Sequence, residues 1–446
     1  MYIGVDLGVS FIKFALFDED TILSVKRVPA PTSKHQVGYL HETDAELFFE
    51  LVKSNLDDFA SRYESIKGIL FSTQMHGVVL FNKQNRIASS YISWKDRRSE
   101  HFYVGGGSAL EHLSKIIPLT SLKKTGMPLR SGLPSVNLFV INRQDSELAK
   151  NKTFGTIADY VVCKLTESDM ATSLSNAAGT GLFNLEINDW NYELIELLGL
   201  EFDLPDVMYG LNQPIGQYKG VDVFSPIGDQ QAALYGLEQN LDRKAVSNIA
   251  TGSQATVVSS KLIMSSGFQT RPFIDDSYLF TIPFIPAGRV LNSLVVFFQS
   301  ISNELFQENF SYDQIWNYFS KYINSIEENS SLDSEKEFLK VDTDLIGSFS
   351  SDGGSIKNIT ENNFHLNALV KAFLFDIVEN HIKAIEQLKE TGVIESILLS
   401  GGIPSKLNLI VRMFQLNQDL PVYLPEVKED ALNGLRLLVK NKVRSW

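Results

Sequence analysis

A carboxylate at the start of a predicted helix is the side chain in this sequence best suited to acid–base chemistry. Gly228-Asp229-Gln230-Gln231 is followed by the helix-forming run Ala232-Ala233-Leu234-Tyr235. The free backbone N–H groups and the dipole of a helix N-terminus favour negative charge and anionic chemistry at such a turn. Asp229 could act there as a general base that takes a proton from a hydroxyl group. The alternative is a helix N-cap, since Asp is one of the preferred N-cap residues.

A second carboxylate precedes a glycine turn near the N-terminus. The β-rich runs 2–7 and 11–17 flank Gly8-Val9-Ser10, which predicts a hairpin. Asp6 lies at the end of the first run and Lys13 lies in the second. The carboxylate, the turn and the lysine could together hold a metal-bound phosphate. An ordinary hairpin with a surface lysine is the alternative.

Two further segments carry polar residues that suit a polyhydroxylated ligand. Gln74-Met75-His76-Gly77 follows a buried strand predicted over 68–72, where side chains of α/β proteins often line a site. The second segment is Trp94-Lys95-Asp96-Arg97-Arg98. An aromatic face can cover C–H groups while a carboxylate and a guanidinium hydrogen-bond hydroxyls. The alternatives are a structural histidine in the first segment and a surface salt-bridge cluster in the second.

The elements that must position these residues form a repeated pattern. Helical periodicity is present over 44–66 and 366–388, and a buried strand is predicted over 394–399. The strand–turn–strand pattern of the N-terminus recurs at 245–258, with Thr251-Gly252-Ser253 as its tight turn. Two such hairpins that face each other could clasp a polyphosphate with backbone N–H groups. Prolines and a glycine near residue 214 indicate a domain junction.

Length, composition and charge narrow the class of protein. A chain of 446 residues with 44% hydrophobic and 21% charged residues is expected to form two or three globular domains. The net charge of −13, with no long basic run, argues against nucleic acid or an anionic membrane as the main partner. The lone cysteine, Cys163, is expected to be buried and fits a reducing compartment. Without a membrane span or a signal-peptide pattern, the sequence predicts a cytoplasmic protein.

At this point the chain resembles a known family, the FGGY carbohydrate kinases. The resemblance rests on motifs that occur in the expected order along nearly the whole chain: Asp6-Leu7-Gly8, Gln74-Met75-His76-Gly77, Trp94-Lys95-Asp96-Arg97-Arg98, Ala177-Ala178-Gly179-Thr180-Gly181, Gly228-Asp229-Gln230-Gln231-Ala232-Ala233, Ala250-Thr251-Gly252-Ser253 and Ser400-Gly401-Gly402. It implies an α/β fold of two actin-like (ribonuclease H-like) ATPase domains with a cleft between them. We expect a sugar-binding domain over 1–220, with the first phosphate hairpin. We expect a nucleotide-binding domain over 221–446, with the catalytic aspartate.

The resemblance also implies a role for each matching residue. Asp229 matches the catalytic base, and Asp6 matches the acidic residue near the metal and the phosphates. The sugar contacts implied are Gln74, Met75, His76, Trp94, Asp96, Arg97 and Gln230. The ATP contacts implied are Asp6, Gly8, Ser10, Lys13, Thr251, Gly252, Gly401 and Gly402. Mg²⁺ is expected at Asp6 and Asp229, through water, and the partners are a small sugar and ATP. A homodimer is compatible with the resemblance.

The acceptor is narrowed by the motifs within the family. Gln-Met-His-Gly is typical of xylulokinase-like and sedoheptulokinase-like members, and Arg271-Pro272-Phe273 and the segment 354–359 look more like sedoheptulokinases. We therefore expect transfer to a terminal hydroxyl of an open-chain ketose, with sedoheptulose first and xylulose or ribulose next. Another polyol or a sugar acid is the alternative.

Departures from the family pattern motivate rival functions. Val9, Ala250 and Ile403 stand where the family often has a small hydroxyl residue or glycine, and each could reduce close approach of backbone to nucleotide. A non-catalytic sugar sensor is one rival, although Asp6 and Asp229 are both present. A chaperone-like or actin-like ATPase that acts on proteins is the other, and the two sugar-type segments argue against it.

Overall fold

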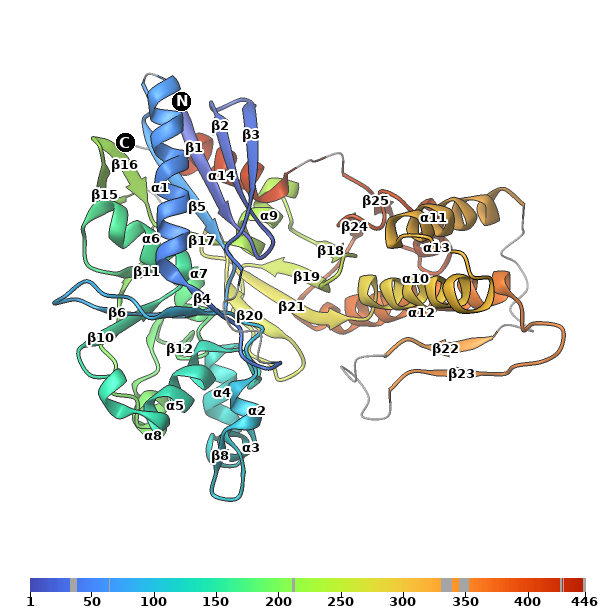
Figure 1. Cartoon of the computed structure of the whole chain (residues 1–446), viewed down its shortest axis with the longest axis horizontal. Helices are drawn as coiled ribbons and strands as arrows, with labels where there is room; N and C mark the ends of the chain where they lie inside the picture. Colours follow the sequence, from blue (N-terminus) through green and yellow to red (C-terminus); the bar gives the residue numbers. More distant parts are fainter. Residues whose placement is uncertain are drawn as a thin grey trace.

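The computed structural model describes residues 1–32, 38–63, 65–210, 213–329, 339–344, 353–425, 427 and 429–443. In Figure 1 a first body with both chain ends stands beside a second body that contains α10 to α13. A mixed β-sheet runs through each body. The strand order is β15-β16-β5-β1-β2-β3 in the first sheet, with β17 also on β5, and β20-β21-β19-β18-β24-β25 in the second.

The first sheet begins with an antiparallel meander, and a parallel strand lies beside its first member. β1 pairs with β2 antiparallel and with β5 parallel, and β16 and β17 run parallel to β5. The strands of this sheet are β1 (Tyr2–Leu7), β2 (Phe11–Phe17), β3 (Ile22–Pro29), β5 (Gly68–Thr73), β15 (Pro214–Tyr218), β16 (Val221–Phe224) and β17 (Ile227–Gly228).

Helices cover both faces of the first sheet, which explains why β1 and β5 are buried along their whole length. α1 (Ala45–Arg62) and α6 (Ile157–Thr166) pack on one face, and Cys163 of α6 is buried there as expected. α9 (Asp229–Leu237) and α14 (Asp430–Leu438) pack on the other face. The helix that begins with Asp229 is therefore held by the first sheet.

A largely helical insertion between β5 and β15 forms its own hydrophobic core. It contains β6 (Val79–Asn82), β7 (Ser90–Ile92), α2 (Arg98–His101), β8 (Tyr103–Val104), β9 (Gly107–Ser108), α3 (Ala109–Ile116), α4 (Leu119–Thr125), α5 (Pro134–Gln144), β10 (Lys152–Gly155), β11 (Ala171–Ser173), α7 (Leu174–Ala178), β12 (Phe183–Asn184), β13 (Asp189–Trp190), α8 (Tyr192–Leu198) and β14 (Asp206–Met208). The short strand β4 (Glu42–Asp44), which precedes α1, pairs with β7.

The second sheet repeats the plan of the first. β18 pairs with β19 antiparallel and with β24 parallel, as β1 does with β2 and β5. The strands are β18 (Lys244–Asn248), β19 (Ser253–Ser259), β20 (Gln269–Pro272), β21 (Tyr278–Ile285), β24 (Ser396–Ser400) and β25 (Val422–Tyr423). The repeated hairpin predicted from the sequence is confirmed.

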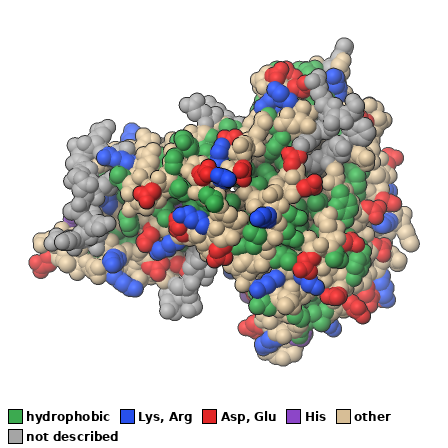
Figure 2. All heavy atoms as spheres, turned by 180° about the vertical axis from the view of Figure 1, so that it is seen from behind, with side chains coloured by type: hydrophobic (Ala, Val, Ile, Leu, Met, Phe, Trp, Pro, Cys, Tyr) green, Lys and Arg blue, Asp and Glu red, His purple; other side chains and the backbone are tan. Residues whose placement is uncertain are grey.

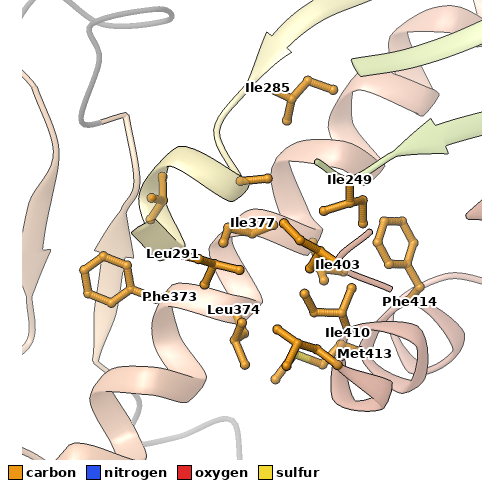
Figure 3. Packing of buried hydrophobic residues seen from close by; sticks show 14 of the residues in the cluster. Ile249, Ile285, Leu291, Phe373, Leu374, Ile377, Ile403, Ile410, Met413 and Phe414 are labelled. Atoms are coloured by element: carbon orange, nitrogen blue, oxygen red, sulfur yellow. The ribbon is translucent and has the colours of Figure 1, made fainter. Parts of the chain in front are cut away.

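The core of the second body lies between this sheet and its helices. Figure 3 shows Leu374 and Ile377 of α12 packed near Ile410 and Met413 of α13, with Ile249 at the end of β18. The remaining elements are α10 (Gly288–Leu305), α11 (Tyr312–Asn329), β22 (Lys340–Asp342), β23 (Ser355–Lys357), α12 (Leu366–Leu388) and α13 (Asn408–Leu416). The long helix predicted over 366–388 is confirmed.

The expected division between residues 220 and 221 falls in the turn between β15 and β16, which are paired strands of one sheet. The first sheet continues to Gly228, and α9 packs against it. We therefore propose that the first domain extends through α9, so that Asp229 belongs to it and not to the second domain.

The surface carries mixed charge. On the face shown in Figure 2, basic and acidic side chains are interspersed and no broad basic field is visible. None of the helices in the described ranges combines the length and the apolar character needed to cross a bilayer.

Candidate active site

The strand register places Asp6 and Asp229 at the carboxyl ends of nearby strands of the first sheet. Asp6 on β1 is aligned with Ser72 on β5, and Ser72 is aligned with Ile227 on β17. Adjacent strands are about 4.8 Å apart, so β1 and β17 lie about 10 Å apart on either side of β5. Two carboxylates that are 223 positions apart in the sequence thus face the same space beyond the carboxyl ends of these strands.

Asp229 is the first residue of α9, and Gly228 is the N-cap. The interpretation of Asp229 itself as the N-cap is therefore wrong. One carboxylate oxygen of Asp229, Oδ1, accepts a hydrogen bond of 2.8 Å from the backbone N–H of Gln230. A side chain at position 228 would require the Gln231 and Met75 side chains to move, since a Cβ there would lie 2.4 Å from Gln231 Oε1 and 2.8 Å from Met75 Sδ.

The surroundings of Asp229 make it a stronger base than an ordinary aspartate. Burial, and then the negative charge of Asp6, raise the pKa of Asp229 to about 6, against the opposing effects of the Gln230 N–H and the Arg271 guanidinium. A carboxylate with this pKa is ionised at neutral pH and holds a captured proton better than a surface aspartate does. The site therefore suits proton abstraction.

Asp6 is 7% exposed and is held by two donors. The Ser72 hydroxyl donates to Asp6 Oδ1 at 3.0 Å, and Lys13 Nζ lies 3.6 Å from Asp6 Oδ2. Lys13 Nζ also lies 3.1 Å from Glu429 Oε2. Burial raises the pKa of Asp6 in spite of the Lys13 charge.

A cation would relieve the repulsion between Asp6 and Asp229, so the residues fit the Mg²⁺ that the family resemblance implies. Within the described ranges, no group of three or more His, Cys, Asp or Glu side chains is gathered to hold a metal. The other ligands of such a cation would have to come from phosphate and water, which Mg²⁺ commonly uses.

His76 is fixed as a neutral imidazole beside the carboxyl end of β5. Its backbone adopts a left-handed conformation, with φ 66°, and His76 Nδ1 lies 2.7 Å from the Gly179 carbonyl oxygen. Because a carbonyl can only accept, Nδ1 carries the proton and Nε2 is left as an acceptor. Burial, and then the charges of Arg130 and Arg271, hold the pKa of His76 well below its usual value. A neutral acceptor of this kind suits a ligand hydroxyl.

Met75 and Gln74 of the same segment contact different parts of the site. Met75 is buried, and its Sδ accepts a contact of 3.1 Å from Arg271 Nη1. The Gln74 backbone N–H donates to the Leu7 carbonyl at 3.1 Å, and Gln74 Nε2 approaches the Gly8 carbonyl at 3.5 Å. Gln74 therefore contacts the first hairpin turn, and its buried Oε1 has no partner within the described residues.

The segment 94–98 is organised differently from its sequence interpretation. The pair formed is Asp96 with Arg98, whose Nε lies 2.8 Å from Asp96 Oδ1, while Arg97 has a 64% exposed side chain. Asp96 is fully buried and also accepts from the His41 N–H at 2.9 Å. Its carboxylate is thus already used to brace the loop. Trp94 is half-buried.

Six of the residues expected to contact ATP lie at the turns of the two hairpins and just after β24, while Asp6 and Lys13 are paired residues of β1 and β2. Asn248 on β18 is aligned with Ser400 on β24, so Thr251-Gly252 and Gly401-Gly402 follow neighbouring strand ends. Gly401 has φ 90°, and a Cβ there would lie 2.4 Å from the Ile249 carbonyl oxygen. Gly8 and Ser10 lie in the equivalent turn of the first hairpin.

Packing explains one of the departures from the family pattern, Ile403. The Ile403 side chain points into the core of the second body near Phe414, as Figure 3 shows, and not toward the turn surface. The Ala250 carbonyl accepts from the Gly288 N–H at 3.1 Å. Val9 is 40% exposed in the first turn, and nothing in the structure explains its choice there.

Gln230 connects α9 to the second sheet. Its Nε2 donates to Thr256 Oγ1 at 3.0 Å and to Thr281 Oγ1 at 3.1 Å, and its Oε1 accepts from Arg271. Both threonines belong to strands of the second sheet. The residue next to Asp229 therefore ties the first domain to the second.

Sequence reasoning assigned no chemical role to Arg271 and did not single out Arg130. Arg271 is 3% exposed on β20 and lies close enough to Asp229 for the two charges to attract. Arg130 stands over the Phe284 ring at 5.3 Å. The sequence did contain a signal for Arg271, because it is the only charged residue in the run 262–274.

A cavity of about 620 Å³ lies beside α9. It is lined by residues of the insertion, of β17 and α9, and of β20 with the turn after it; Gln231 and Pro272 are among them, and Asp229 is not. The Gln231 Nε2 group donates to the Pro272 carbonyl at 3.1 Å, so this wall of the cavity is fixed.

Comparison with known proteins gives a consistent result. The profile of the "FGGY family of carbohydrate kinases, N-terminal domain" matches residues 1–236. A xylulose kinase of Staphylococcus xylosus is 27% identical over 221 residues, which is 48% of this chain and 44% of that protein, so the match spans less than half the length of that relative. A glycerol kinase of Saccharolobus islandicus is 24% identical over the whole chain and 88% of its own length. The glycerol kinase of Plasmodium falciparum, solved with ADP, superposes with a TM-score of 0.82 at 17% identity, over 99% of this chain and 91% of that one.

Proposed function

Because the chain belongs to the FGGY family of carbohydrate kinases, we propose that it transfers the γ-phosphoryl group of ATP to a terminal hydroxyl of an open-chain sugar. The observation that carries this proposal is the position of Asp229. It is a partly buried carboxylate with a pKa of about 6, next to Gln230, which bonds the second sheet, and across β5 from Asp6.

In the proposed reaction, Asp229 accepts the proton of the acceptor hydroxyl while the hydroxyl oxygen forms a bond to the γ-phosphorus and ADP departs. Proton transfer of this kind accelerates a reaction by about 100- to 10,000-fold. The rest of the acceleration comes from positioning and charge stabilisation, as is general for phosphoryl transfer. Neutral His76 and Gln230 would orient the sugar beside Asp229.

ATP would lie against the two hairpin turns and the turn after β24. Backbone N–H groups of the turns at Gly8 and Thr251-Gly252, with Lys13, would contact its phosphates. Gly401-Gly402 would allow close approach of the nucleotide, because neither residue carries a side chain. Mg²⁺ near Asp6 and Asp229 would supply neutralisation of phosphate charge.

The motif resemblance ranks sedoheptulose first among neutral acceptors, with xylulose and ribulose next. Met75, His76, Trp94, Asp96 and Arg97 remain the proposed sugar contacts, and in the present conformation Asp96 would have to exchange a protein donor for a sugar hydroxyl. Two arginines that form no salt bridge among the described residues, the buried Arg271 and the partly buried Arg130, favour a second class of acceptor, a sugar acid.

The test is a panel of ketoses, polyols and sugar acids assayed for ATP-dependent formation of a sugar phosphate. Product formation with at least one acceptor is expected. Sugar binding without product would instead indicate a sugar sensor. ATP hydrolysis at a rate indifferent to every sugar would indicate an ATPase that acts on proteins.

We further propose a cytoplasmic setting, in keeping with the single reduced cysteine and with ATP as donor. A homodimer remains a prediction, which light scattering of the purified protein would check.

A further inference from the structure

Among the described residues, two arginines near His76 form no salt bridge, although the charge of Asp229 attracts Arg271. Arg271 Nη1 contacts Met75 Sδ at 3.1 Å, its Nη2 group contacts Gln230 Oε1 and Thr281 Oγ1, and its Nε has no partner. The one hydrogen bond of Arg130 goes from Nη1 to the Ser131 carbonyl at 3.4 Å, and its buried Nε is also unpaired. Within the described residues, neither guanidinium forms an ion pair.

Arg98 shows how this chain normally buries a guanidinium. Arg98 is 8% exposed and is bonded to both Asp96 oxygens and to Glu42. A buried charge without such a partner is strongly destabilising. Burial lowers the pKa of Arg130 to about 10. Burial lowers the pKa of Arg271 to about 10, against the opposing charge of Asp229 and with a smaller contribution from the charge of Arg130. Both arginines therefore remain cations at neutral pH.

The Arg130 loop is fixed in place at both ends by glycines in the left-handed region. Gly126, with φ 67°, packs so closely on β20 that a Cβ would lie 2.1 Å from the Thr270 carbonyl oxygen. At the other end is Gly132, with φ 84°, where a Cβ would lie 2.0 Å from the Trp94 carbonyl oxygen. The Thr270 N–H also donates to the Gly126 carbonyl at 2.8 Å. Arg130 is therefore held against the strand that carries Arg271.

The two arginines lie on the sugar side of the site. Both charges act on His76, and Arg271 contacts Met75 and Gln230. In the second sheet, β20 is separated from β18 by β21 and β19, which places it about 14 Å from the strand ends expected to contact the nucleotide. The γ-phosphate is therefore not the natural partner of these cations.

We propose that the acceptor is a linear polyhydroxy acid whose carboxylate is bound by Arg271 and Arg130 while a hydroxyl faces Asp229. A planar guanidinium matches a carboxylate in a two-point hydrogen bond, and two guanidiniums can share its oxygens. A neutral ketose would leave Arg130 without an opposing charge and Arg271 with only the charge of Asp229. This inference rests on the proposed function, and it moves the acceptor away from the ketoses that the sequence motifs favour.

The test compares gluconate with gluconamide, which has the same carbon chain and hydroxyls but no charge. With the intact protein and Mg-ATP, kcat/KM for the acid should exceed that for the amide by about 10- to 100-fold, the usual range for a hydrogen bond to a charged group. Arg271→Gln and Arg130→Gln should each raise KM for the acid by a larger factor than KM for the amide. Because Arg271 also bonds Gln230, its replacement should weaken turnover of both acceptors to some extent, and the ratio of acid to amide is the decisive quantity.

Matched variants separate a lost charge from a lost structure. Arg271→Lys keeps the positive charge and should keep part of the preference for the acid. Arg143, which stands over the Phe139 ring at 5.4 Å in an exposed position, is the control, and Arg143→Gln should not change the preference. Thermal unfolding would show that each variant is folded.

Failure of the inference is distinguishable from failure of the proposed function. Calorimetry without ATP should show tighter binding of gluconate than of gluconamide. Such binding without product would sustain the acid site and overturn the kinase proposal. Phosphorylation of ketoses, of amides or of a sugar monophosphate as efficient as that of the acid would overturn the inference alone. Equal binding of acid and amide, or no binding of either, would also overturn it.

Discussion

At the scale of single residues, three successive side chains at the start of α9 have different tasks. Asp229 faces Asp6 across β5, Gln230 bonds Thr256, Thr281 and Arg271, and Gln231 bonds the Pro272 carbonyl. Successive residues of a helix point about 100° apart, so one turn can present a base to the site and anchor it to the second sheet. The three successive residues of the motif therefore have three different sets of partners.

The first prediction concerns the proposed base. Asp229→Asn keeps the size and the hydrogen bond to Gln230 but cannot take a proton, so kcat should fall by about 100- to 10,000-fold with little change in sugar affinity. Steady-state kinetics and equilibrium sugar binding would measure both quantities. Asp313→Asn, an exposed change on α11, should leave both unchanged. Near-normal turnover of Asp229→Asn would remove Asp229 from the role.

A second prediction concerns pH. Since the base must be ionised and burial beside Asp6 raises the pKa of Asp229 to about 6, kcat/KM should rise as pH increases through about 6 and level off above it. A pH–rate profile measured over pH 4.5 to 8 would show this limb. A flat profile down to pH 4.5 would contradict the assignment.

The third prediction is that the same variant gains stability. The pKa of Asp229 is about 6 in the folded protein against 3.8 for an ordinary aspartate, so the ionised carboxylate disfavours the folded state. Above pH 6, Asp229→Asn should raise the free energy of unfolding by roughly 1–3 kcal/mol. The gain should shrink as pH falls below 6 and disappear below 3.8, where Asp229 is protonated in both the folded and the unfolded protein. Denaturant unfolding at pH 7.5 and pH 4 would test the sign.

At the scale of elements, the helix that carries Asp229 is positioned by a close crossing with the C-terminal helix. A Cβ on Gly434 of α14 would lie 1.9 Å from the Ala232 carbonyl oxygen, and a Cβ on Gly236 of α9 would lie 1.9 Å from the Asp430 carbonyl oxygen. Asn433 Nδ2 adds a hydrogen bond of 2.6 Å to the Gly236 carbonyl. Two glycines therefore set the distance between the helices.

We predict that Gly434→Ala lowers the free energy of unfolding by about 1–3 kcal/mol, because backbone atoms, and not a flexible side chain, oppose the new methyl group. The displaced α9 should also reduce kcat. Chemical denaturation and kinetics would measure the two effects. Gly38→Ala, where no atom lies within 4 Å of the added Cβ, is the control. An unchanged unfolding midpoint for Gly434→Ala would mean that the helices can separate without cost.

At the scale of the whole molecule, the last helix returns to the first sheet. Leu432 and Leu435 of α14 are buried in one cluster with Tyr2 and Phe17 of the N-terminal hairpin. Lys13 of β2 and Arg27 of β3 also pair with Glu429, just before α14. The N-terminal fold is therefore completed by residues more than 400 positions away, as Figure 1 shows by the position of α14 beside β1.

The fifth prediction follows from this closure. Leu435→Ala, at a site 1% exposed, should destabilise the protein by about 2–5 kcal/mol, and it should loosen the first sheet although the change is near the C-terminus. Hydrogen exchange should show faster exchange in β1 and β2. Leu416→Ala, at a site 59% exposed, is the control. Normal protection of β1 in the Leu435 variant would contradict this account.

The family, the repeated hairpin and the fold class could all be predicted from local sequence. Strand–turn–strand patterns and the long helix over 366–388 follow from periodicity in the sequence. Asp6 and Asp229 stand in short motifs with a glycine nearby. The domain limit near 220 was less accessible, because strand pairing across the junction leaves no local signal there.

Tertiary structure alone decided which charges meet. Asp96 pairs with Arg98 and not with its neighbour Arg97, since the backbone direction of the loop selects which of two adjacent arginines turns inward. The approach of Arg130 to Arg271 depends on contacts between segments more than 100 residues apart. Sequence by itself determined the family, the hairpins and the carboxylates, because those are local patterns. The basicity of Asp229 and the unpaired arginines are properties of burial and of long-range packing, which only the folded chain contains.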